Sequence, residues 1–232
     1  HMICNGSERY PVRGVYQKMK SRSLSTMQGA FTTVDFTIFP IASRIEKDLF
    51  NLAEVFFNCI FRPRLTRELF EREAHRIEIH TCAPEKGPNG IAGSDRVPEI
   101  AFGGTVYTEM RSAFSRPDRL FRSALNRGLF PDTSNRFLGT GDPAELLTLS
   151  YEQLLEHWKR HYQPGNCIFL LCGDIPPQRW LDWFDERLAD FGPAKSVLYQ
   201  EQQPQFSEPR QILERYPAAG GAASATTFGG MA

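Results

Sequence analysis

Residues 30–60, AFTTVDFTIFPIASRIEKDLFNLAEVFFNCI, pass from a strand pattern to a helix pattern within one stretch. The first part, from Ala30 to Pro40, is rich in Thr, Val, Ile and Phe, which favours a β-strand, and Pro40 cannot donate a hydrogen bond that would continue a ladder. In the second part, apolar residues recur at spacings of three and four, as on one face of an amphipathic helix: Ile45, Leu49, Leu52, Ala53, Phe56 and Ile60. A strand followed by a core helix is therefore predicted.

Outside this stretch, the sequence predicts further helices and strands. Thr66 and Ser150 are residue types that cap the first turn of a helix. Helices are predicted over residues 66–80, 106–113, 120–129, 150–162 and 180–191. Cys167 to Cys172 (CIFLLC) is a short, continuous apolar run of the kind found in buried strands, and a further strand is predicted near Gln211 to Tyr216. Because strands and helices are interleaved, we expect an α/β layer architecture.

Two segments have the composition of loops or linkers. Residues 82–100 contain Pro, Gly, Asn, Ser and Asp at loop frequency, and a flexible insertion is predicted there. Residues 218–232 are mostly Gly, Ala, Ser and Thr, which is typical of a flexible tail, although a truncated strand is the alternative. We expect a single domain over residues 1–217.

Charge and cysteine content exclude some classes of function. The 27 basic and 27 acidic side chains cancel, so we expect no binding to nucleic acid or to an anionic membrane surface. There is no apolar run of about 18 residues that would predict a membrane span. The five cysteines are odd in number and form no C-x-x-C pair, which indicates free thiols in a reducing intracellular compartment, such as the cytoplasm, a mitochondrion or a plastid.

Several side chains are candidates for chemistry before any family is considered. The acidic candidates, Glu71, Glu73, Glu78 and Glu109, all lie in predicted helices, where a charged residue is most often on a solvated face. His157 and His161 have the i, i+4 spacing that allows two imidazoles to bind one metal ion. A solvated helix face is the favoured interpretation of this pair, because no carboxylate stands between the two histidines and the intervening basic residues would repel a cation.

A series of blocks in this sequence resembles the N-terminal domain of presequence proteases and their relatives in the pitrilysin/insulinase class of zinc metallopeptidases. Each block is weak alone, but their order and approximate spacing match over nearly the whole chain. The blocks are GSERYP (6–11), AFT (30–32), DLFNL (48–52), FRP (61–63), FERE (70–73), VYTEM (106–110), SRPD (115–118), LFPDT (129–133), GDP (141–143) and HYQPGN (161–166). The resemblance implies a mixed, largely antiparallel sheet covered by helices.

The resemblance also implies a zinc site. Enzymes of this class use an inverted H-x-x-E-H motif and a distant glutamate, and the Glu of the motif is the general base. His1 aligns with the second His of the motif, although His1-Met2 also matches what a cloning site leaves behind. Glu109 aligns with the distant zinc ligand, and Glu73 aligns with an acid that supports the zinc site without binding the metal.

According to this alignment, the first His and the catalytic Glu of the motif precede residue 1. Catalytic zinc normally has three protein ligands, so the chain by itself is expected to bind zinc weakly and to be inactive. The implied partners of the parent enzyme are unfolded peptides and the C-terminal half of the same protein.

The family's substrate-pairing strand aligns with Gly29-Ala30. Relatives usually have Asn where this chain has Gly29, so one side-chain hydrogen bond to the peptide is missing while the backbone groups remain. Two alternatives stay open for the whole protein. One is a structural or partner subunit of the same fold that has lost the zinc motif, and the other is an α/β binding domain unrelated to peptidases.

Overall fold

A computed structural model describes residues 1–81, 98–193 and 202–213 of the chain. These residues form eight α-helices and six short strands, so the predicted combination of helices with largely antiparallel sheet is confirmed. The helices are α1 Val15–Arg22, α2 Glu46–Phe61, α3 Arg67–Glu73, α4 Thr105–Phe114, α5 Pro117–Leu129, α6 Pro143–Leu146, α7 Tyr151–His161 and α8 Pro177–Leu188. The strands are β1 Ser25–Gln28, β2 Phe31–Thr32, β3 Thr37–Ile38, β4 Ile41–Ser43, β5 Arg76–Thr81 and β6 Pro98–Gly103. Three 3₁₀ turns complete the described elements: η1 Ile3–Asn5, η2 Ser134–Arg136 and η3 Pro164–Asn166.

The strand predicted over Ala30 to Pro40 is in fact the end of a long hairpin. Strand β1 pairs antiparallel with β4, and β2 pairs antiparallel with β3. The chain reverses between Thr33 and Phe36, where the Thr33 amide donates to the Phe36 carbonyl at 2.8 Å and the Thr33 hydroxyl donates to Asp35 at 2.9 Å. Thr and Asp side chains that bond to nearby backbone and side-chain groups favour such turns, so the single-strand prediction was wrong at its centre.

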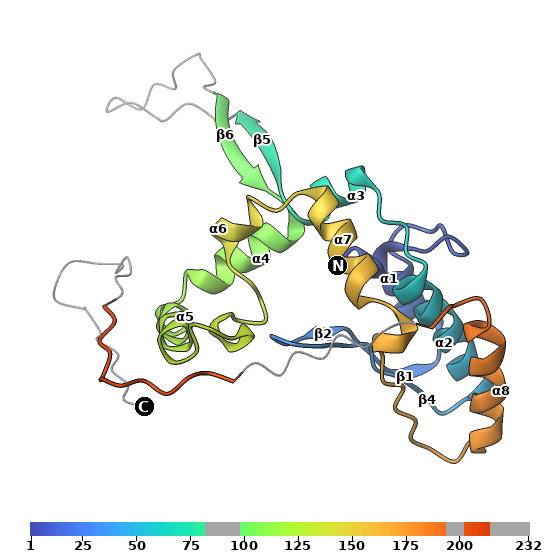
Figure 1. The fold of residues 1–232 in the computed structure, drawn as a ribbon. Helices are drawn as coiled ribbons and strands as arrows, with labels where there is room; N and C mark the ends of the chain where they lie inside the picture. Colours follow the sequence, from blue (N-terminus) through green and yellow to red (C-terminus); the bar gives the residue numbers. More distant parts are fainter. Residues whose placement is uncertain (82–97, 194–201, 214–232) are drawn as a thin grey trace.

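Helix α2 forms the principal core of the described residues together with α8, and the two helices lie side by side (Figure 1). Their shared cluster is strongly aromatic. Trp183 of α8 meets Phe57 of α2 edge to face, with ring centroids 5.7 Å apart, and Trp180 lies 4.4 Å from Phe50. Such pairs add to the free energy gained by burying the rings. The helix predicted from residue 45 is thus confirmed, with Ile45 as its N-cap.

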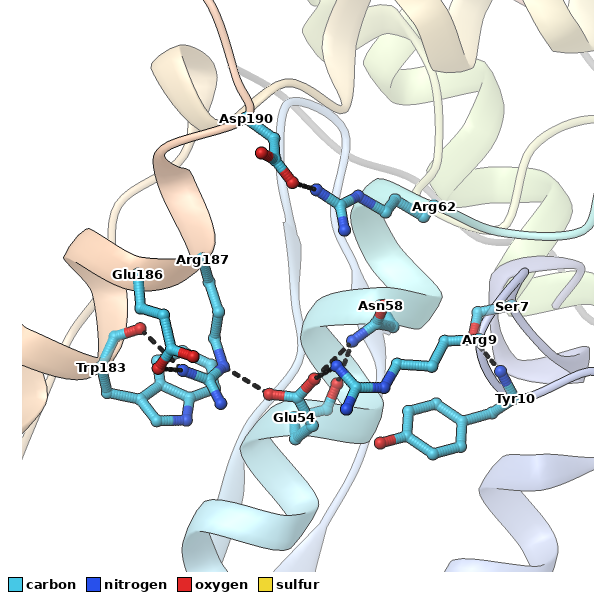
Figure 2. A network of polar contacts seen from close by, with 10 residues as sticks. All are labelled: Ser7, Arg9, Tyr10, Glu54, Asn58, Arg62, Trp183, Glu186, Arg187 and Asp190. Atoms are coloured by element: carbon cyan, nitrogen blue, oxygen red, sulfur yellow. Dashed lines mark hydrogen bonds and ion pairs between the residues drawn. The ribbon is translucent and has the colours of Figure 1, made fainter.

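A buried carboxylate reinforces the contact between α2 and α8. Glu54 of α2, whose side chain is 13% exposed, accepts a hydrogen bond from Arg9 at 2.8 Å, and it is also ion-paired with Arg187 of α8. The Asn58 amide donates to the same carboxylate at 3.0 Å (Figure 2). Three donors therefore satisfy one largely buried charge, which links α8 and the segment after η1 to the same turn of α2.

We expect Glu54→Gln to lower the free energy of unfolding by about 2 kcal/mol, because hydrogen bonds to a charged group are lost and Arg187 remains partly buried without its partner. Urea denaturation followed by circular dichroism measures the change. The matched control is Glu186→Gln, since Glu186 bonds to the same arginine but is 77% exposed. We expect the control to cost less than about 0.5 kcal/mol. Equal losses for the two variants would contradict this account.

The helix predicted over residues 66–80 ends at Glu73. Thr66 caps its start as predicted, accepting a hydrogen bond from the Leu69 amide at 3.2 Å. Residues 76–81 instead form β5, which pairs in register with β6. The sequence Arg-Ile-Glu-Ile-His at 76–80 alternates polar and β-branched residues with period two, which favours a strand over a helix. Within the insertion predicted over 82–100, residues 98–100 belong to β6, and residues 82–97 lie outside the described part of the chain.

The β5–β6 hairpin projects from the rest of the molecule (Figure 1) and has two different faces. Ile77 is opposite Phe102 and Ile79 is opposite Ile100, and these four side chains are between 47% and 74% exposed. The opposite face carries Arg76, Glu78, His80, Glu99 and Ala101. The apolar face of this hairpin is therefore exposed to solvent in the described structure, as is much of its polar face.

The apolar run from Cys167 to Cys172 was predicted as a buried strand, and this prediction was wrong. Ile168 and Leu170 are 93% and 90% exposed, and the run pairs with no strand among the described residues. Only its inner side is packed, with Phe169 4.4 Å from the Phe184 ring. A run of this composition is buried where other elements cover both faces of the strand, and Ile168 and Leu170 have no such cover in the described structure. The strand predicted near Gln211 to Tyr216 is likewise absent from residues 211–213, and residues 214–216 lie outside the described part.

Other local predictions are confirmed. Helices α4 and α5 cover the segments 106–113 and 120–129 that were predicted to be helical, and Ser150 forms a capping box with Gln153 at the start of α7. Cys4, Cys59, Cys167 and Cys172 are free thiols, while Cys82 lies outside the described residues.

Among the described helices, none has the length and apolar character needed to cross a bilayer. The predicted domain limits, 1–217 and 218–232, stay a prediction, and residues 218–232 are not described.

Candidate metal centre

The three residues that the sequence singled out for a metal site lie together. His1 Nε2 is 3.2 Å from a carboxylate oxygen of Glu109, and His1 Nδ1 is 3.6 Å from a carboxylate oxygen of Glu73. They come from three separate parts of the chain, namely the N-terminus, α3 and α4. The imidazole is therefore placed between two carboxylates, one on each ring nitrogen.

A close approach of α4 to the end of α3 brings the two glutamates near each other. Gly104 precedes α4 with φ of 125°, and a Cβ at this position would lie 2.4 Å from the Ala74 carbonyl oxygen, so only glycine fits. The Tyr107 amide donates to that same carbonyl at 3.2 Å. Buried Met2 belongs to the same apolar cluster as Ala74, which fixes the chain directly after His1.

His1 and Glu109 have the donor types and the separation that suit a zinc ion. At Zn–N and Zn–O bond lengths of about 2.1 Å, two ligands of a tetrahedral ion stand roughly 3.4 Å apart. The observed separation of 3.2 Å is close to this value, and both side chains are accessible, with exposures of 44% and 62%. In the part of the chain that the structure describes, no set of three His, Cys, Asp or Glu residues converges on one point. The two residues therefore fit as part of a zinc site.

Two neighbours of this site were given no role from the sequence, although Arg72 lies within the FERE block. Asn5 donates to Glu73 at 3.3 Å and to the His1 carbonyl at 3.0 Å, and Arg72 donates to Glu73 at 3.0 Å. Asn5 and Arg72 are separated by 67 positions in the sequence, so no local pattern connects them.

A groove of about 610 Å³ adjoins Glu109. The polar face of the β5–β6 hairpin forms one side of it through Arg76, Glu78 and His80, and α4 forms the other through residues that include Glu109 and Arg111. Glu78 is ion-paired with both Arg76 and His80, the latter at 3.1 Å. The groove is thus lined by balanced charges, and Glu109 lies within it.

The predicted substrate-pairing residues make no described contact with this centre. The Gly29 amide donates to the Pro40 carbonyl at 3.0 Å, so it is used inside the long hairpin. Ala30 is exposed, and within the described residues its own backbone groups make no hydrogen bond to the backbone. Among the described contacts, neither residue bonds to His1 or Glu109. Of these two residues, Ala30 is thus the exposed one, with no backbone hydrogen bond among the described residues.

The histidine pair of α7 does not join the candidate centre. The His157 and His161 rings lie 4.5 Å apart. Partial burial, the neighbouring His161 and Arg160 lower the pKa of His157, and partial burial and Arg160 lower that of His161. Both imidazoles therefore favour the neutral form near pH 7, and among the described residues they have no third ligand nearby.

Comparison with known proteins gives one consistent result. Residues 148–221 match the family described as Peptidase M16 inactive domain. The chain is 33% identical over 186 residues to the mitochondrial presequence protease of Danio rerio, covering 80% of this chain and 17% of that protein. It is 35% identical over 197 residues to the mitochondrial presequence protease of Aspergillus oryzae, covering 84% and 18%. The chain thus spans about a fifth of the length of these relatives.

Solved structures with a similar fold include two bacterial proteases. The first half of the periplasmic protease PqqL from Escherichia coli matches with a TM-score of 0.59 at 19% identity, covering 90% of this chain and 39% of that one. A protease from Helicobacter pylori matches with a TM-score of 0.62 at 17% identity, covering 88% and 41%. The resemblance on which the site residues were chosen is therefore confirmed at the level of family and fold.

Proposed function

This chain belongs to the M16 peptidase family, and we propose that it contributes part of the active site of a zinc-dependent endopeptidase that degrades unfolded peptides. The observation that carries the proposal is the convergence of His1, Glu73 and Glu109, which are far apart in the sequence. Glu109 is 62% exposed, and its carboxylate nevertheless lies 3.2 Å from the imidazole of the N-terminal residue.

In this proposal, His1 binds the metal through Nε2 and Glu109 through a carboxylate oxygen. The Glu73 carboxylate lies 3.6 Å from His1 Nδ1, and in this proposal its negative charge favours the proton on Nδ1 and so leaves Nε2 free for the metal. Zinc, when bound, supplies an activated water and polarises the scissile carbonyl. The general base and the remaining ligand come from outside this chain, so we propose that the chain by itself does not cleave peptides.

The groove beside Glu109 is the proposed place for the peptide. An extended peptide requires backbone partners and room for alternate side chains. The exposed backbone of Ala30 and the groove between β5–β6 and α4 offer these two elements. The remainder of the substrate chamber, in this proposal, comes from the C-terminal half of the same protein.

A quenched fluorescent peptide tests the proposed function. We expect a full-length protein that contains this chain to cleave the peptide, a chelator to abolish the cleavage, and added zinc to restore it. We expect the 232-residue chain to show no chelator-sensitive cleavage under the same conditions. Cleavage by the full-length protein that persists after metal removal would contradict the zinc mechanism, and chelator-sensitive cleavage by the 232-residue chain would contradict its incompleteness.

A second candidate function is a structural or partner subunit without catalysis. It is favoured by the match of residues 148–221 to a domain described as inactive. The same peptide assay separates the two candidates, because a structural subunit neither cleaves the peptide nor binds zinc.

The curated relatives bear mitochondrial and chloroplastic names. Since the four described cysteines are free thiols, we propose a reducing compartment of this kind for the present protein.

A further inference from the structure

Asn5 and Arg72 form a closed set of hydrogen bonds around Glu73. The Arg72 guanidinium donates from Nη2 to Asn5 Oδ1 at 3.0 Å and from Nε to Glu73 Oε1 at 3.0 Å. The Asn5 amide donates to the same Glu73 oxygen at 3.3 Å. Each of the three side chains therefore bonds to the other two.

The two carboxylate oxygens of Glu73 have different partners. Oε1 accepts from Arg72 and Asn5, while Oε2 faces His1 Nδ1 at 3.6 Å. The Glu73 side chain is only 11% exposed, so water contributes little to its solvation. A carboxylate at this depth is stable only when donors satisfy it. Arg72 and Asn5 supply those donors on the side away from the histidine.

Asn5 also restrains His1 directly. Its amide donates to the His1 carbonyl at 3.0 Å, and its backbone amide donates to the Met2 carbonyl at 3.0 Å at the end of η1. The His1 side chain is 44% exposed, so burial alone does not fix its position. One residue therefore connects the backbone that carries the imidazole to the carboxylate that orients it.

We propose that Asn5 and Arg72 are positioning residues for the metal pair, which fix His1 and Glu73 so that Nε2 points at Glu109. This inference rests on the proposed function, because it assigns these residues to the zinc site of that function. Neither residue touches the metal or the peptide. They act through Glu73 and through the His1 backbone, and displacement of a ligand by a fraction of an ångström is enough to weaken a metal site.

Three variants of the full-length protein separate this role from a general effect on stability. Asn5→Ala removes all its side-chain bonds. Asn5→Asp keeps the acceptor for Arg72 but loses the donors to Glu73 and His1. Arg72→Lys keeps the charge but loses the fork that bonds Asn5 and Glu73 together. The matched control is Arg67→Lys on the same helix, because Arg67 is paired with exposed Glu152 and has no described bond to the metal pair.

Zinc affinity, measured by competition with a chelating dye, is the main readout, and urea unfolding of the metal-free protein is the second. We expect the three variants to weaken zinc binding by about 10-fold to 100-fold, the range known for residues that support metal ligands. The kcat should fall while the KM for peptide stays near the wild-type value. Arg67→Lys should match the wild type in all measurements.

Two results would overturn the inference. Wild-type zinc affinity in all three variants excludes the positioning role, and so does a loss of affinity in proportion to the lost stability of the metal-free protein. Absence of zinc binding in the wild type itself, with Glu109→Gln making no difference, is a distinct result. It overturns the proposed function, and the role of Asn5 and Arg72 falls with it.

Discussion

Glu109→Gln in the full-length protein lowers peptide hydrolysis by more than about 100-fold, because even residues that only support a metal ligand cost 10-fold to 100-fold when replaced. The amide that replaces the carboxylate is neutral, so it binds a divalent cation poorly, and it no longer attracts the His1 imidazole across the present 3.2 Å. Initial rates on a quenched peptide, together with bound zinc measured after dialysis, check this expectation.

Glu71→Gln is the matched control for Glu109→Gln. Glu71 is exposed on α3 and was an equally good acidic candidate before the family resemblance was considered. We expect it to retain wild-type activity and wild-type zinc content. If both variants lose activity equally, or if Glu109→Gln retains both zinc and activity, Glu109 is not a ligand.

The second large effect concerns the core. Trp183→Ala lowers the free energy of unfolding by about 3–5 kcal/mol, the range for removing a buried aromatic ring. Trp183 is 9% exposed, and its ring lies 5.1 Å from Phe184 and 4.2 Å from the Arg187 guanidinium. The substitution therefore removes an apolar surface and also the ring against which Arg187 is held beside Glu54.

Urea denaturation followed by far-ultraviolet circular dichroism measures the effect of Trp183→Ala. Leu181→Ala is the control on the same helix, because Leu181 is 58% exposed. We expect the control to cost less than about 1 kcal/mol. Losses of similar size in the two variants would show that α8 does not depend on the aromatic cluster.

Local patterns in the sequence were sufficient where a single element determines its own structure. The spacing of apolar residues in 45–60 predicted α2, and the caps at Thr66 and Ser150 predicted where two helices begin. The patterns failed where pairing with a distant segment decides the outcome. Residues 76–80 contain both a helix-compatible charge pattern and a period-two pattern, and pairing with residues 98–103 selects the strand.

At the candidate site too, the sequence predicted the residues that belong to motifs but not those whose role depends on contacts with distant segments. The family blocks identified His1, Glu73 and Glu109, each by its alignment within a motif. No role was predicted from the sequence for Asn5 or for Arg72, although Arg72 lies within the FERE block, because their importance arises from hydrogen bonds between residues 67 and 68 positions apart. The Gly103-Gly104 pair stands just before the helix predicted over residues 106–113. Its role as the contact that lets α4 approach Ala74 became visible only in the structure.

The exposed apolar rows on β5–β6 and at Ile168 and Leu170 affect how the stability of this chain should be assayed. Some fluorescent dyes report thermal unfolding by binding hydrophobic surface that unfolding exposes. Such dyes would already bind the exposed hydrophobic side chains of the folded protein. Their baseline would be high and the thermal transition shallow, even for a cooperatively folded chain. Intrinsic tryptophan emission avoids this background, since Trp180 and Trp183 are buried between α2 and α8.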